Sequence, residues 1–221
     1  MPQVKVKEVP LLVTEGIGSI SLLEVSPSDA RAVVVLAHGA GAGMKHRFME
    51  ALAMGLAELS IATVRFNFPY VENGRKRPDA PGIAEKAVEK VMEYAHTRFP
   101  KLPLFLAGKS FGGRMSSQLL SKYSPPWVRG IIFYGFPLHP TGAPGTDRAK
   151  HLSLVKVPML FLSGTKDTLA DMSLLEGVIK TLPKAQLIKF EGADHSFNRA
   201  KTDNIPVLAE ATDSWVQENS R

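Results

Sequence analysis

Short, largely apolar segments recur along the chain, and they constrain the fold more than any other feature. The first is residues 32–37, Ala-Val-Val-Val-Leu-Ala, and similar segments follow at 61–66, 104–107, 128–134 and 159–163. A strand with one face in water alternates apolar and polar side chains, whereas a strand that is covered on both faces has no need to. These segments therefore predict the buried strands of a parallel sheet.

Stretches with apolar residues at helical spacing separate these segments. The expected helices cover residues 48–59, 83–98, 112–123, 173–182 and 205–218. A last strand is expected at 186–190, and an antiparallel pair of edge strands near 4–6 and 18–25 precedes the whole series. Because strands that alternate with helices form right-handed crossovers, the pattern predicts an α/β fold with a doubly wound, mostly parallel sheet.

Length and composition fit one globular domain. Hydrophobic residues make up 44% of the 221 residues, and no repeat or linker divides them, so a single domain over 1–221 is expected. No apolar run approaches the roughly 18 residues that a membrane helix needs. The N-terminus also lacks the apolar segment of a secretory signal. We therefore expect a cytoplasmic protein that does not bind membranes.

Charge and cysteine content narrow the chemistry. The chain has no cysteine, which excludes disulfides, thiolate metal sites and cysteine nucleophiles, and we expect neither a metal nor a cofactor. The net charge is +6, but only Arg75-Lys76-Arg77 forms a basic cluster, in a loop without stacking aromatic residues. The excess charge is therefore interpreted as solvated surface, and nucleic acid is not an expected partner.

The segment Gly108-Lys109-Ser110-Phe111-Gly112 joins a very apolar predicted strand to a helix. A serine in so tight a strand-to-helix turn needs neighbours without bulk, and glycines stand two residues before and after it. The segment also resembles the end of a phosphate-binding loop, Gly-x-x-x-x-Gly-Lys-Ser. That interpretation fails because its first glycine would fall on Pro103. Ser110 is therefore the candidate nucleophile.

A serine nucleophile needs a histidine base and an acid that orients the histidine. Asp167 follows the predicted strand at 159–163, and His195 follows the strand at 186–190, which gives the order serine, acid, histidine. Asp171 is the alternative acid, although its position favours a helix N-cap before Ser173. The sequence therefore predicts a triad of Ser110, Asp167 and His195.

The other histidines fit this triad less well. His139 and His151 precede the acid in the chain, and His96 is interpreted as exposed near the end of a helix. His38 is interpreted as organising the glycine-rich loop that follows it, and His46 as lining the entrance to the site.

Stabilising a tetrahedral intermediate requires two N–H donors. One is expected from Phe111, the residue after the nucleophile, and the other from the glycine-rich loop 39–43, where Ala40 is preferred and Gly41 is the alternative. The residues expected to contact the substrate are Gly41, Phe68, Tyr70, Phe136 and Leu138.

Together with the ordered triad, four segments resemble the α/β-hydrolase family. They are His-Gly-Ala-Gly at 38–41, Arg-Phe-Asn-Phe-Pro at 65–69, Gly-Lys-Ser-Phe-Gly-Gly-Arg at 108–114 and Gly-Phe-Pro-Leu-His-Pro at 135–140. They are similar to small hydrolases related to dienelactone hydrolases and to the hydrolase-like domain of KANSL-type chromatin subunits. The resemblance implies an α/β-hydrolase fold and hydrolysis of an ester or another acyl group by the triad.

Two departures limit what the resemblance implies. Dienelactone hydrolases proper use a cysteine nucleophile, which this chain lacks, so their reaction is not carried over. Lids of this fold commonly enter after the sixth strand, where only the short segment 135–157 is available, so no separate cap domain is expected.

These features predict a serine hydrolase that cleaves a carboxylic ester, or a thioester, of a small-molecule acyl substrate through an acyl-enzyme intermediate. Two alternatives stay open. The same groups suit a serine peptidase, and the chromatin relatives suggest a non-catalytic interaction module. The sequence does not indicate an oligomeric state.

Overall fold

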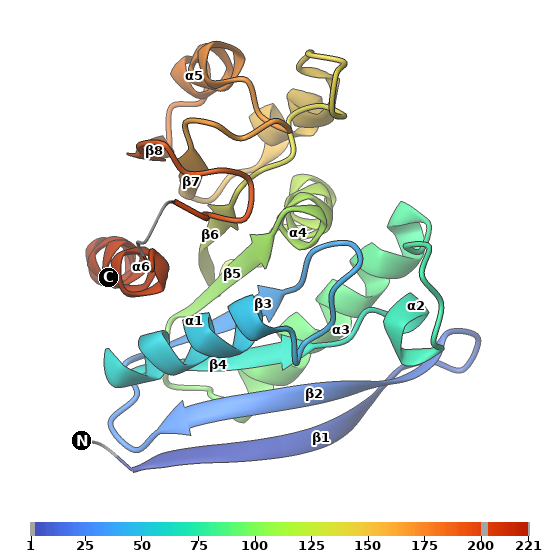
Figure 1. The fold of residues 1–221 in the computed structure, drawn as a ribbon. Coiled ribbons are helices and arrows are strands. Elements are labelled where there is room, and N and C mark those ends of the chain that lie inside the picture. The colour runs from blue at the N-terminus through green and yellow to red at the C-terminus, as the bar shows by residue number, and fades with distance from the viewer. Residues whose placement is uncertain (1–2, 200–202, 221) are drawn as a thin grey trace.

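The computed structural model describes residues 3–199 and 203–220, which form a sheet of eight strands in the order β1-β2-β4-β3-β5-β6-β7-β8 (Figure 1). β1 (Val4–Thr14) and β2 (Gly18–Pro27) are antiparallel, and β2 is antiparallel to β4 (Ile61–Phe66). The remaining pairs are parallel and involve β3 (Ala32–Ala37), β5 (Leu104–Lys109), β6 (Val128–Tyr134), β7 (Met159–Gly164) and β8 (Ala185–Phe190). The predicted doubly wound, mostly parallel sheet is confirmed.

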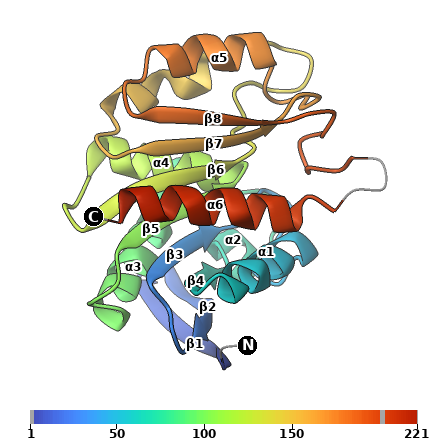
Figure 2. The same cartoon turned by 90° about the vertical axis from the view of Figure 1, so that its left-hand side faces the viewer.

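Helices cover both faces of this sheet (Figure 2). α1 (Arg47–Glu58) and α6 (Ile205–Asn219) pack on one face, where they enclose an apolar core with β3 and β5. The opposite core packs under α3 (Pro81–Arg98), α4 (Phe111–Lys122) and α5 (Met172–Lys180). Because both faces are covered, β3, β4 and β7 are buried at every position, as their apolar sequences predict.

The predicted bounds of the five longer helices agree with the structure to within about two residues at each end. The antiparallel pair is longer than expected, and β2 lies one strand in from the edge, because it also pairs with β4. Two short helices in loops were not predicted, α2 (Pro69–Glu72) and the 3₁₀ helix η1 (Asp147–Leu154). They are too short to show a helical period.

The sheet brings the loops that follow its parallel strands to one edge.

The segment between β6 and β7 holds only a loop and η1, so the expectation of no separate cap domain is confirmed. Within residues 3–199 and 203–220, no helix has the length and apolar character needed to cross a bilayer.

Gly130 in β6 tests how closely α6 packs on the sheet. A Cβ at this position would lie 2.4 Å from the ring of Trp215, which is 3% exposed on α6. G130A is therefore expected to lower the free energy of unfolding by about 1–3 kcal/mol, measured by urea denaturation. The matched control is G177A in α5, where a Cβ meets nothing within 4 Å. It should raise stability by about 0.5–1 kcal/mol. A G130A variant as stable as the wild type would contradict this packing.

Candidate active site

Ser110 stands in the turn between β5 and α4 with strained backbone angles, φ 50° and ψ −113°. Such a conformation costs an L-residue about 1–3 kcal/mol. The turn is held by the Ser110 N–H, which donates to the Tyr134 carbonyl at 3.2 Å, and by the Ser110 carbonyl, which accepts from Arg114 at 3.1 Å. This tight turn places Ser110 at the carboxyl end of the central strands.

The two glycines of this turn are required by backbone contacts. A Cβ on Gly108 would lie 2.2 Å from the backbone nitrogen of Gly113. A Cβ on Gly112 would lie 2.5 Å from the carbonyl oxygen of Ala37, at the end of β3. Both distances are far shorter than any real Cβ contact, so the sequence-based reason for these glycines holds in the structure.

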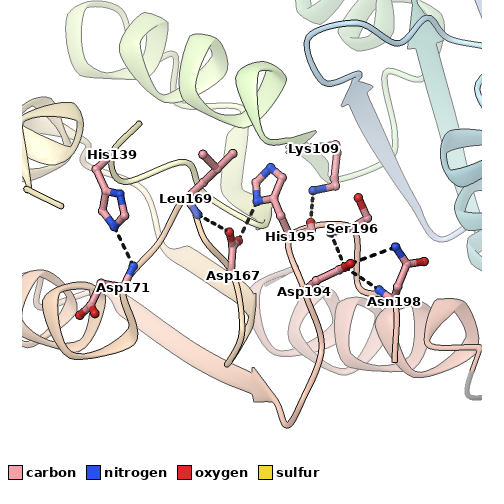
Figure 3. Close-up of polar contacts among 9 residues, drawn as sticks. All are labelled: Lys109, His139, Asp167, Leu169, Asp171, Asp194, His195, Ser196 and Asn198. Carbon is pink, nitrogen blue, oxygen red and sulfur yellow. Dashed lines mark hydrogen bonds and ion pairs between the residues drawn. The ribbon is translucent and has the colours of Figure 1, made fainter. Parts of the chain in front are cut away.

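His195 and Asp167 meet in the loops after β8 and β7 (Figure 3). Nδ1 of His195 lies 2.7 Å from Oδ2 of Asp167, whose side chain is fully buried. The other carboxylate oxygen accepts the N–H of Leu169 at 2.8 Å. A carboxylate that accepts at Nδ1 keeps the proton on that nitrogen and leaves Nε2 free to act as a base.

The two loops that carry this pair are packed backbone against backbone. A Cβ on Gly164 would lie 2.3 Å from the carbonyl oxygen of Ala193, and that oxygen accepts the N–H of Lys166 at 2.9 Å. Asp194 caps its own loop by accepting from the N–H groups of Ser196 and Asn198, each at 2.8 Å. The imidazole is therefore carried by a closely braced loop.

Asp171, the alternative acid, has a different role. It is the N-cap of α5 and accepts from the N–H of Leu174 at 3.0 Å, as its sequence position predicted. Its own N–H donates to Nε2 of His139 at 2.9 Å. Figure 3 shows its carboxylate directed away from His195. The structure therefore brings Asp167, rather than Asp171, to the imidazole.

Ser110 and His195 line one cavity of about 960 Å³. In the part of the chain that the structure describes, no hydrogen bond joins the two side chains. Apo active sites often have such long contacts, which tighten when substrate binds. The cavity wall comes from the glycine-rich loop, the start of α1, and the segments around His195 and before α6.

A family model for an alpha/beta hydrolase domain matches residues 30–218 of this sequence. The chain belongs to this family. Its fold is also that of a dienelactone hydrolase from Anabaena variabilis, which is 19% identical, with a TM-score of 0.81 and coverage of 99% of this chain and 100% of that chain. A lid-less α/β serine hydrolase from Xanthomonas campestris is 21% identical, with a TM-score of 0.75 and coverage of 97% and 94%. The esterase domain of a Rhodothermus marinus protein is 14% identical, with a TM-score of 0.75 and coverage of 98% and 100%.

In this α/β hydrolase, side chains at the end of β4 hold the glycine-rich loop. The buried Arg65 donates from Nη1 to the carbonyl of Met44 at 2.8 Å, and Oδ1 of Asn67 accepts the N–H of the same residue at 2.9 Å. Both backbone groups of Met44 are thus fixed. This role of Arg65 was not predicted, although an arginine inside a largely apolar strand was a signal for it.

His38 fixes the other end of this loop. Its Nε2 accepts the N–H of Phe68 at 3.1 Å, and Nδ1 donates to the carbonyl of Gly39 at 2.8 Å. The predicted organising role therefore has a geometric basis. Ala40 and Gly41 both lie on the cavity wall. Among the backbone hydrogen bonds of the described residues, none uses the N–H of Ala40 or of Phe111, so both groups remain available as donors.

Four of the residues expected to contact substrate lie in the core instead. Phe68, Tyr70, Phe136 and Leu138 are each at most 1% exposed. Tyr70 borders a neighbouring cavity of about 710 Å³, which it shares with Gly41. The large apolar side chains on the wall around Ser110 are Phe48, Met49, Leu169, Phe197 and Ile205. The reason is tertiary, because the starts of α1 and α6 lie far apart in the sequence and contribute to one cavity wall only in the folded chain.

The state of His38 makes stability depend on pH. Burial lowers the pKa of this histidine from 6.5 to about 4, and the nearby His46 acts in the same direction against the Gly39 carbonyl. The unfolded chain therefore takes up a proton between pH 6.5 and 4 that the folded chain refuses, so stability falls as the pH drops through this window. Once the pH is below this window, the titration of His38 has lowered the free energy of unfolding by roughly 3 kcal/mol.

H38N removes this titration and should flatten the loss of unfolding free energy between pH 6.5 and 4, measured by urea denaturation at each pH. Burial also lowers the pKa of His151 to about 4, but His151 is present in both proteins. The difference between the two curves of unfolding free energy against pH therefore isolates His38. Parallel curves for the two proteins would show that His38 titrates normally in the folded state.

Proposed function

We propose that this α/β hydrolase is a serine esterase that cleaves a carboxylic ester through an acyl-enzyme intermediate. The observation that carries the proposal is the 2.7 Å hydrogen bond from Nδ1 of His195 to the buried carboxylate of Asp167, at the cavity that Ser110 also lines. An imidazole oriented in this way can activate a serine hydroxyl, which is otherwise a poor nucleophile at neutral pH.

In the first half of the reaction, Oγ of Ser110 attacks the ester carbonyl carbon, and its proton passes to Nε2 of His195. The buried Asp167 carboxylate stabilises the imidazolium that forms. The tetrahedral intermediate collapses, the C–O bond to the alcohol breaks, and the alcohol leaves with the proton from Nε2. Water then repeats the sequence on the acyl-enzyme and releases the acid.

The oxyanion is assigned to the N–H groups of Ala40 and Phe111. Phe111 opens α4, so its N–H lies at a helix N-terminus, where developing negative charge is stabilised. Ala40 is the preferred donor of the glycine-rich loop and Gly41 the alternative, because both line the cavity that Ser110 also lines. Each donor contributes about 10²–10³ to the rate.

The cavity supports a small acyl substrate. Its apolar side chains suit an acyl or alkyl group, and the absence of a cap domain leaves its mouth open. The esterase domain of the Rhodothermus marinus protein shares the fold, which adds support for an ester rather than an amide. A thioester would be cleaved by the same steps.

A fluorophosphonate probe followed by intact-mass analysis tests the nucleophile. The wild type is expected to gain one covalent adduct, and S110A none, because the probe reacts only with an activated serine. The matched control is S196A, since Ser196 is an exposed serine on the same cavity wall and should leave the labelling unchanged. An adduct on S110A, or no adduct on the folded wild type, would contradict the assignment.

The acid is tested by comparing two isosteric changes in an ester hydrolysis assay. D167N should lower kcat by about 10⁴, because the amide favours the wrong imidazole tautomer. D171N removes only an exposed helix cap and should retain near wild-type kcat with a loss of stability of about 1 kcal/mol or less. For the base, H195A should lower kcat by about 10⁴–10⁶. The reverse ranking of the two aspartates would identify Asp171 as the acid.

A further inference from the structure

Lys109 is a half-buried amine inside the catalytic cavity that the proposed reaction does not use. It directly precedes Ser110 in the chain and ends β5. Its Nζ donates a hydrogen bond to the backbone carbonyl of His195, as Figure 3 shows. The side chain thus links the strand that carries the nucleophile to the loop that carries the histidine.

Two aromatic rings hold the amine in this position. Nζ lies 5.9 Å from the ring centre of Phe48 on α1 and 5.5 Å from that of Phe197. The two rings are stacked, with centres 6.2 Å apart and planes 17° from parallel. Both distances are within the range of cation–π attraction, which favours the charged form of the amine.

The amine also lies close to the imidazole ring itself. A Cβ on Gly135 would lie 3.2 Å from Nζ of Lys109 and 3.3 Å from both Cε1 and Nδ1 of His195. The two groups therefore face the same point above Gly135, whose φ of +70° also favours glycine. A side chain here would push the amine and the ring apart.

Charged groups surround the Lys109 amine and influence its protonation state. The carboxylates of Asp167 and Asp194 attract the ammonium. Further out on the cavity wall stand His46 and Arg47 from α1, and Arg199 and Asp203 from the segment before α6. Burial lowers the pKa of the Lys109 amine to about 8, so it remains mostly charged at neutral pH.

We propose that Lys109 is a positioning residue that anchors the His195 backbone and whose ammonium opposes protonation of the His195 imidazole. The inference rests on the proposed function, since it concerns the base of that reaction. A base must be unprotonated to accept the serine proton, and the Asp167 carboxylate that accepts from Nδ1 of the ring works against this. Lys109 supplies the compensating positive charge.

The test is a titration of the His195 ring by NMR, following the Cε1–H resonance that disappears in H195A. K109Q keeps a hydrogen-bond donor without the charge, K109M removes both, and K109R keeps both. K109Q and K109M are expected to raise the midpoint by about one pH unit, while K109R stays close to the wild type. K101M, at an exposed site before β5, removes one remote charge and should not move the midpoint.

The acid limb of the kcat/KM profile for ester hydrolysis should move with the midpoint in the same variants. A K109Q midpoint equal to the wild type would overturn the proposal, because a purely structural lysine changes stability or kcat without shifting the titration. If K109M does not fold, K109Q and K109R decide the question. A wild type without ester hydrolysis contradicts the proposed function instead, and the NMR titration still tests the charge.

Discussion

The close approach of two backbone segments at the carboxyl edge of the sheet is the constraint on which the site depends. The turn after β5 touches the end of β3 with no room for a side chain at Gly112, and the turn itself leaves none at Gly108. This contact forces Ser110 into its strained conformation and places it beside the glycine-rich loop. The strain persists because the neighbouring strands are buried on both faces and cannot relax toward solvent.

Around that turn, polar side chains hold the loops that form the site. Arg65 and Asn67 bind both backbone groups of Met44, and His38 binds the backbone of the next segment. The histidine loop is held by Asp194 and by Lys109. Polar groups buried in this way are worth more than surface contacts, because leaving them unpaired costs the full desolvation penalty.

Much of the fold and part of the candidate site could be predicted from sequence. Apolar runs define buried strands, and glycines around a serine define a tight turn, because both signals are local in the chain. The cavity wall could not be predicted in this way. Phe68 and Phe136 were expected to line the substrate site but are buried in the core, whereas the half-buried Phe48 lies on the cavity wall. Which aromatic side chain stays accessible depends on the loop that covers it.

By itself, the sequence determined the succession of strands and helices along the chain, the serine turn, and the positions of Asp167 and His195 after successive strands. Only the tertiary structure decided that the Asp167 carboxylate reaches the imidazole at 2.7 Å, and that Lys109 lies beside the same ring. The physical reason is that local patterns specify backbone conformation, whereas the partner of a charge is set by segments that are distant in the chain and meet only when the sheet is assembled.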